Sequence, residues 1–248
     1  MVAESGAIGT GVGAPRYFLT PDTFLARADG VLVFLDLRSD EYLCLEPSLT
    51  GGVSRLLGLP LPGRDGGGGA EDGSTAEAEL EELVEAGLIT ADPGAGKPAL
   101  PGSGRDGLRE MPRFDIGAGP KVRARHVAAF VLAFAIARSW LRLAPIHRIV
   151  GRVARRKAKR RARNDVERAR ELSEIYRKLR PLFMSRKDQC LLNSLLLIEF
   201  LARFGLYPSW HFGVRVREFS AHCWVEDEGL LYDDDVENVC KYAVIMKV

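Results

Sequence analysis

The chain has 248 residues and a hydrophobic content of 46%, which allows one large domain or two small ones with buried cores. Its net charge is only +2, but residues 121–163 contain 14 Lys and Arg and no Asp or Glu, so the charge is strongly local. The four cysteines form no CxxC pair and no His lies at zinc-finger spacing, which argues against a metal site or a disulfide framework. Reduced thiols and the lack of a recognisable signal peptide favour a cytoplasmic protein.

The N-terminal part is expected to begin with strands and continue with helices. Residues 31–37 and 42–46 are β-rich runs separated by the charged turn RSDE, a pattern typical of a hairpin, and the apolar runs upstream are candidates for a further strand. Residues 48–59 predict a short helix. Residues 75–90 predict an amphipathic helix that stops at Gly87.

Two Gly- and Pro-rich stretches divide the sequence. Residues 62–74 are interpreted as a loop inside the N-terminal domain, because glycine loses the most backbone entropy on ordering. Residues 93–120 are predicted to be a linker. The predicted domains are therefore residues 15–92 and 121–248.

The C-terminal part is expected to be helices followed by an antiparallel sheet. The helices are predicted at residues 121–143, 146–162, 165–183 and 188–204, and the strands at 209–218, 221–229 and 230–235. The apolar run VAAFVLAFAIA in the first helix is too short for a membrane span and predicts a buried helix. Residues 148–163, with nine Lys and Arg, predict a solvated face or a surface for a partner protein, an acidic peptide or a membrane.

A possible nucleophile lies at the start of the predicted helix 188–204. A helix N-terminus favours the thiolate of Cys190, although a cysteine there is more often a small buried hydrophobe. His222 follows on a predicted strand and could take the thiol proton, and Asp234 could orient the imidazole. Asp233 and Asp235 adjoin Asp234, so strand alternation alone leaves the choice of acid open.

The segment from DQCLL to KYAVI resembles the leader-peptidase domain of lasso-peptide B proteins, which has a transglutaminase-like, papain-like cysteine protease fold. The matching motifs are Cys-Leu at a helix start, Gly-Leu-x-Pro, F-G-V, A-H-x-W-V-E and an acidic turn before Y-A-V. The resemblance implies that Cys190 is the nucleophile, His222 the general base and then acid, and Asp234 the orienting carboxylate. Cys223 departs from the family's usual alanine and places a second thiol close to the site, on the other strand face.

The N-terminal region resembles the precursor-recognition domain of ribosomal-peptide biosynthesis, a three-stranded sheet on a winged helix-turn-helix. In that family the leader peptide adds as a strand to the sheet edge and packs against the last helix. The resemblance implies a leader-binding site at Tyr42, Leu43, Cys44, Leu45, Leu80, Leu83 and Val84. The local charge is acidic and no basic recognition helix is visible, so nucleic acid is not an expected partner.

Together these resemblances imply an α+β, two-domain cysteine peptidase that cuts the leader from a lasso-peptide precursor before macrolactam closure. The expected partners are the precursor and an ATP-dependent macrolactam synthetase, with no cofactor, metal or membrane contact. The backbone N–H of Cys190 and the side chain of Gln189 are candidate oxyanion donors. A non-catalytic peptide-binding adaptor and a transglutaminase-like acyltransferase remain as alternatives.

Overall fold

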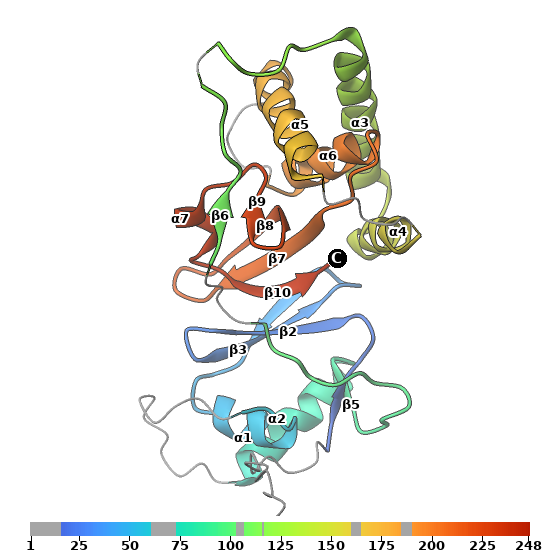
Figure 1. Ribbon diagram of the computed structural model, residues 1–248. Helices are drawn as coiled ribbons and strands as arrows, with labels where there is room; N and C mark the ends of the chain where they lie inside the picture. The colour runs from blue at the N-terminus through green and yellow to red at the C-terminus, as the bar shows by residue number, and fades with distance from the viewer. Residues whose placement is uncertain (1–15, 61–72, 103–106, 116, 160–164, 185–189) are drawn as a thin grey trace, which may run out of the picture.

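The structure is a computed structural model that describes residues 16–60, 73–102, 107–115, 117–159, 165–184 and 190–248 (Figure 1). It combines helices and sheets in an α+β arrangement, as predicted. The N-terminal elements form one end of the molecule, and the C-terminal sheet separates them from a group of helices at the other end (Figure 1).

The N-terminal half contains a three-stranded antiparallel sheet in the order β2-β3-β4, which leaves β4 at an edge. The elements of the N-terminal half are β1 (Phe18–Leu19), β2 (Thr23–Ala28), β3 (Val31–Asp36), β4 (Glu41–Cys44), α1 (Thr50–Leu56), α2 (Gly73–Glu85) and β5 (Ile89–Thr90). The hairpin predicted around RSDE is therefore present as β3 and β4. Gly87 has φ of +72° just after α2, which fits the predicted helix stop.

Strand β3 is apolar at successive positions because both of its faces are buried. Leu32 and Phe34 point into a core with α1 and α2, whereas Val33 and Leu35 point into a second core shared with the C-terminal half. The sheet therefore joins the two halves of the chain. The described residues do not establish the winged helix-turn-helix predicted for this half, and the loop expected at residues 62–74 lies largely outside them.

The C-terminal half consists of helices followed by a five-stranded sheet in the order β10-β7-β8-β9-β6. Its helices are α3 (Ala124–Leu143), α4 (Ile146–Ala158), α5 (Val166–Leu179), a 3₁₀ turn η1 (Arg180–Leu182), α6 (Cys190–Ala202) and α7 (Val236–Val239). Its strands are β6 (Arg109–Glu110), β7 (Ser209–Arg215), β8 (Ser220–Asp227), β9 (Leu230–Leu231) and β10 (Ala243–Lys247). The sequence did not predict β6, α7 or β10.

The two halves meet where β10 packs against β2, and one hydrophobic core runs through this contact. Gly102 lies at this contact and makes two backbone hydrogen bonds with β2. Its carbonyl accepts from the Arg27 N–H at 2.8 Å, and its N–H donates to the Leu25 carbonyl at 3.0 Å. A Cβ on Gly102 would fall 1.6 Å from the Val244 carbonyl oxygen, so only glycine fits there. The segment predicted as a linker thus packs closely against both halves.

The burial predicted for the apolar run in α3 is wrong for much of the helix. Its buried residues are His126, Phe130, Ala133 and Ala137. Val127, Val131 and Leu132 are exposed. Judged by length and composition alone, α3 is long and apolar enough to cross a membrane. In its most apolar 18-residue stretch, 22% of the residues are buried inside the protein. Composition predicted burial, but among the described residues other helices pack against only one side of α3.

Candidate active site

Cys190 is the first residue of α6 and its side chain is half-buried. The helix behind it is held in place by its apolar side chains, which are buried over most of its length. Ser194, one turn on, donates a hydrogen bond from Oγ to the Cys190 carbonyl at 2.8 Å and accepts one from Trp210 Nε1 at 2.9 Å. The thiol therefore lies at the positive end of a firmly packed helix, where a thiolate is favoured.

His222 lies on β8, paired with Gly213 of β7. Its imidazole is flanked by Trp224, stacked at a ring-centroid distance of 6.1 Å, and by Tyr242 at 5.2 Å. Gly213 makes room for this arrangement, because a Cβ there would lie 2.8 Å from the Trp224 ring and 2.9 Å from Tyr242 Cβ. The ring thus lies between two aromatic side chains.

Asp234 follows β9 and contacts the imidazole of His222 at its Nε2 atom. Its Oδ2 lies 2.6 Å from His222 Nε2. Its Oδ1 accepts hydrogen bonds from the Asp235 backbone N–H at 2.9 Å and from Asn238 Nδ2 at 3.1 Å. The imidazole also interacts with the Cys190 thiol.

The electrostatics of the group favour a thiolate beside an imidazolium. Hydrogen bonds from the Cys223 thiol and from His222, together with the imidazolium charge, lower the pKa of Cys190 to about 4 against the effect of burial. Burial lowers the pKa of His222, but its hydrogen bonds with Asp234 and Cys190 outweigh this and raise it to about 10. Burial alone would raise the pKa of Asp234, yet the hydrogen bond with His222 keeps it below its usual value.

The three neighbouring aspartates occupy different surroundings. Asp233 forms an ion pair with Arg180 and accepts a hydrogen bond from Asn193 Nδ2 at 3.2 Å, and its burial raises its pKa. Asp235 is exposed and precedes α7 as its N-cap. Of the three aspartates, only Asp234 contacts the imidazole, which favours it as the orienting carboxylate.

A cavity of about 210 Å³ opens beside the thiol and the imidazole. The C-terminal half contributes Cys190, His222, Cys223 and neighbouring apolar side chains to its lining. The N-terminal hairpin contributes Leu35, Leu37, Asp40 and Tyr42. Tyr42 also packs edge-on against Phe219, with ring centroids 5.6 Å apart. The hairpin thus forms one wall of the candidate site, which the sequence did not predict.

The residues predicted to bind a leader peptide divide into two groups. Tyr42, Leu43 and Cys44 lie on the edge strand β4, and Leu43 and Val84 are exposed. Leu45, Leu80 and Leu83 are buried in the core between the sheet and the helices. The prediction that these three line an open surface is wrong, because the apolar stripe of α2 packs against the protein's own sheet.

Several positions near the site were missed or cannot be placed. Asn238, which contacts both Asp234 and His222 Nε2 (3.3 Å), lies in a four-residue helix that carries no sequence signal. Gln189, the predicted oxyanion donor, lies outside the described residues. Among the described residues no group of three or more His, Cys, Asp or Glu is arranged to hold a metal ion.

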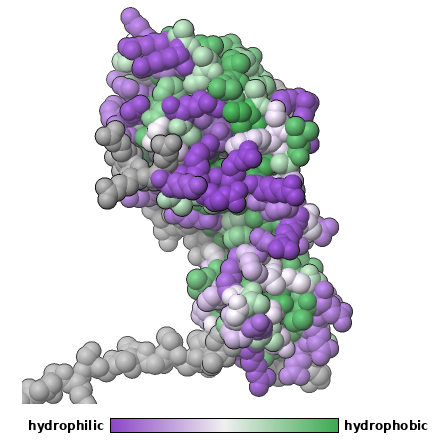
Figure 2. Space-filling model, turned by 90° about the vertical axis from the view of Figure 1, so that its right-hand side faces the viewer, coloured by the Kyte–Doolittle hydropathy of each residue, from purple (hydrophilic) through white to green (hydrophobic). Residues whose placement is uncertain are grey.

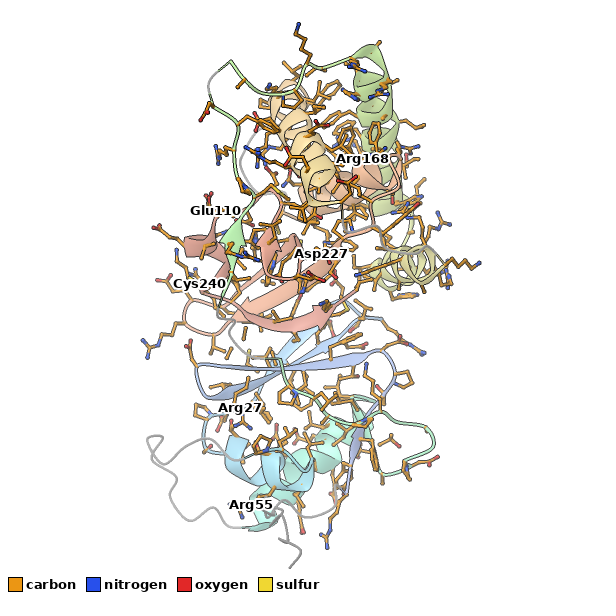
Figure 3. All side chains as sticks on the ribbon, viewed as in Figure 1. Arg27, Arg55, Glu110, Arg168, Asp227 and Cys240 are labelled. Carbon is orange, nitrogen blue, oxygen red and sulfur yellow. The ribbon has the colours of Figure 1, made fainter. Side chains whose placement is uncertain are left out.

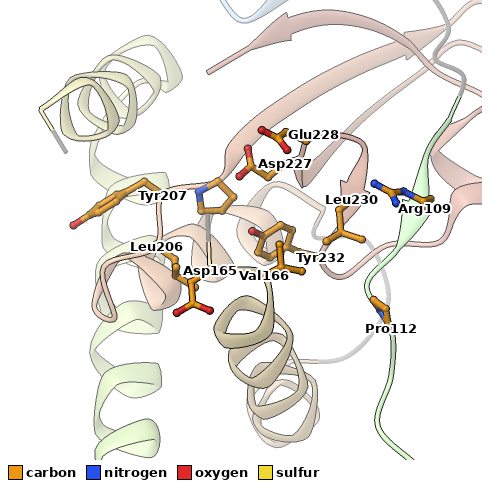
Figure 4. Close-up of a pocket in the computed structure, with 11 residues that line it drawn as sticks. Arg109, Pro112, Asp165, Val166, Leu206, Tyr207, Asp227, Glu228, Leu230 and Tyr232 are labelled. Atoms are coloured by element: carbon orange, nitrogen blue, oxygen red, sulfur yellow. The ribbon is translucent and has the colours of Figure 1, made fainter. Parts of the chain in front are cut away.

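A second cavity, of about 290 Å³, lies between α5, the α6–β7 connection and the β8–β9 turn (Figure 4). Asp165, Tyr207, Asp227 and Tyr232 are among its lining residues. It contains neither the thiol, nor the imidazole, nor Asp234. We therefore place the candidate active site at the smaller cavity, where the reactive groups converge.

Residues 128–247 match the transglutaminase-like superfamily. The C-terminal half is therefore a transglutaminase-like domain, a fold typical of cysteine peptidases and acyltransferases. No curated protein and no solved structure matches the chain.

Proposed function

We propose that this protein is a cytoplasmic cysteine peptidase that binds the leader of a lasso-peptide precursor and hydrolyses the leader–core bond before macrolactam closure. The observation that carries the proposal is the contact of His222 with Asp234 at 2.6 Å, on an imidazole that also interacts with the Cys190 thiol. A thiolate–imidazolium pair of this kind is already activated for attack on a peptide carbonyl.

The chemistry follows from the protonation states of the pair. The Cys190 thiolate attacks the carbonyl carbon, and the oxyanion is stabilised by the Cys190 backbone N–H at the start of α6. The His222 imidazolium gives its proton to the leaving amine, which releases the core peptide with a free N-terminus. Neutral His222 then takes a proton from water, which hydrolyses the thioester and frees the leader.

The position of β4 supports a role for the N-terminal half in presenting the leader. β4 is an edge strand, and an extended peptide can add to such an edge through backbone hydrogen bonds. The Leu45 N–H donates inward to the Leu32 carbonyl at 2.9 Å, so alternation turns the Cys44 N–H toward the free edge. Because Tyr42 of the same strand lines the cavity at Cys190, a leader on this edge would lead directly to the thiol.

The peptidase reaction is tested with the full chain and the precursor peptide encoded beside its gene. Mass spectrometry is expected to find two products whose masses sum to that of the precursor plus one water, and none with Cys190→Ala. Cleavage that persists in Cys190→Ala contradicts the proposal. A product joined to an added amine would instead support an acyltransferase, and intact precursor bound by the wild-type chain would support an adaptor.

Leader binding is tested separately, by fluorescence anisotropy of a labelled leader peptide. Cys44→Pro removes the outward donor from an edge strand, where proline is tolerated, and is expected to weaken binding by roughly tenfold. Cys44→Ala keeps that donor and serves as the matched control. Equal affinity of the proline and alanine variants for the leader would rule out strand addition at β4.

A further inference from the structure

The outer face of α3 carries three exposed apolar side chains over its first three turns, with exposed Arg125 near the start of the helix. Val127, Val131 and Leu132 are 38%, 45% and 51% exposed and lie on the side of the helix away from its buried residues. We name these three residues the α3 stripe. Phe183, 40% exposed, packs against Phe130 at a centroid distance of 5.1 Å and enlarges the apolar area. Such an exposed apolar area needs a reason in a folded protein.

The outer face of α4 carries only positive charge. Arg148, Arg152, Arg155 and Lys159 recur at helical spacing and are exposed, while Ile149, Val150 and Val153 of the opposite face are buried. We name the four cations the α4 basic face. Two further cations, Arg156 and Lys157, are used internally, to pair with Glu199 at 2.6 Å and to bind Ser209.

The α3 stripe and the α4 basic face lie on two consecutive helices that contact each other. The Arg152 guanidinium lies 4.4 Å from the centre of the Trp140 ring of α3, which connects the two helices. Exposed Arg138 and Arg142 extend the positive charge along the last turns of α3. The space-filling view shows hydrophobic and hydrophilic side chains gathered in adjacent areas on this side of the molecule (Figure 2).

We propose that this surface docks reversibly on an anionic lipid membrane. An aliphatic stripe bordered by cations, without a single Asp or Glu between residues 116 and 164, suits insertion among acyl chains beside negatively charged headgroups. A protein partner would more often be met by a polar rim of both charges and by aromatic anchors. The proposal takes up one alternative that the sequence left for residues 148–163 and departs from the expectation of no membrane contact.

The packing of α3 favours attachment to the surface over spanning. Phe130, Ala133 and Ala137 are completely buried in the core that also holds α5 and α6. A helix crossing the bilayer would have to expose the opposite side to lipid and abandon this core. With its inner side retained, α3 can lie in the plane of the headgroups, next to α4.

The test is co-sedimentation of the full chain with vesicles, which needs no peptidase activity and is independent of the proposed function. We expect binding to vesicles that contain phosphatidylglycerol, little binding to pure phosphatidylcholine, and weaker binding at high salt. Val131→Asp and the double variant Arg148→Glu/Arg155→Glu are each expected to weaken binding tenfold or more. Both change exposed residues, so circular dichroism should show an intact fold.

Matched controls place the same changes elsewhere. Leu100→Asp is an apolar-to-acidic change at an exposed site of the N-terminal half, and Arg55→Glu reverses a charge at the end of the molecule away from α3 (Figure 3). Both should bind vesicles like the wild type. Absence of binding to anionic vesicles at low salt overturns the proposal. Loss of vesicle binding in Arg148→Glu/Arg155→Glu but not in Val131→Asp also overturns it, because it indicates adsorption without insertion. A complex with an acidic protein that depends on the same residues, in a protein that does not bind vesicles, would overturn it as well.

Discussion

Gly213→Ala is expected to disturb the candidate active site by displacing the two aromatic side chains that flank the His222 imidazole. Gly213 faces His222 across the β7–β8 pair, and a Cβ added there would lie 2.8 Å from the Trp224 ring and 2.9 Å from Tyr242 Cβ. Both neighbours are buried, so neither can swing into solvent. To regain ordinary contact the Trp224 ring must move by roughly 0.6 Å, in a core that is closely packed.

The size of the effect follows from this overpacking. Extra methylene-sized groups in a packed core cost about 1–3 kcal/mol, which for a chain of this length lowers Tm by roughly 2–12 °C. Because Trp224 and Tyr242 both flank His222, their displacement moves the imidazole relative to Cys190. We expect precursor cleavage to slow by about tenfold or more, since small misplacements of reacting groups are costly.

The measurement pairs thermal unfolding with single-turnover cleavage of the precursor. Gly151→Ala is the matched control: Gly151 lies inside α4, and the nearest atom to an added Cβ is the flexible end of Arg155 at 3.8 Å. That variant should be as stable as the wild type or more so by up to about 1 kcal/mol, because alanine favours helix. If Gly213→Ala matched Gly151→Ala in both Tm and cleavage rate, the two flanking aromatic side chains would not position His222.

Three further predictions concern the site and its setting. The ultraviolet absorbance of the Cys190 thiolate should titrate with a midpoint of about pH 4, and this titration should be absent in Cys190→Ala and have a higher midpoint in His222→Ala. Activity should fall toward pH 4, where the thiolate is protonated, and toward pH 10, where the imidazolium loses its proton. An ordinary thiol titration would contradict the proposed pair. Asp234→Asn should reduce kcat by about 10³- to 10⁴-fold with little change in Tm, whereas Asp233→Asn should lower Tm through its ion pair with Arg180 and leave the pH profile of activity unchanged. Calorimetry of the intact chain should show one transition, because a single core joins both halves; two separate transitions would contradict this.

The sequence was most informative where chemistry depends on residues that are close along the chain. Cys190 near a helix start and His222 on a strand could be placed because these elements had their own periodicity, whereas Asp234, expected inside a strand at residues 230–235, follows the two-residue strand β9. The choice of Asp234 over Asp233 required the structure, since it depends on Arg180 and Asn193 from distant helices. The missed strand β6 has two residues and exists only through its pairing with β9.

The wrong predictions share a physical cause. An apolar stripe on a helix shows that one side avoids water, but it does not show what covers that side. In α2, Leu80 and Leu83 are covered by the protein's own sheet, so they are not available to a peptide. In α3 the converse occurs: the run is apolar all around, and Val131 stays exposed because no element in the part of the chain that the structure describes lies over it.

The cavity shared by the hairpin and the C-terminal half limits how this protein could be re-engineered. Under the proposed function the N-terminal half would be the recognition domain, and such domains are attractive units to exchange in order to redirect a peptidase to new precursors. Here a transplanted domain would also have to reproduce Leu35, Leu37 and Tyr42 at the thiol, and the glycine that lets the connecting segment pass β10. A successful chimaera would therefore exchange only the side of the N-terminal sheet that faces α1 and α2. It would keep the residues of β2 and β3 that face the C-terminal half.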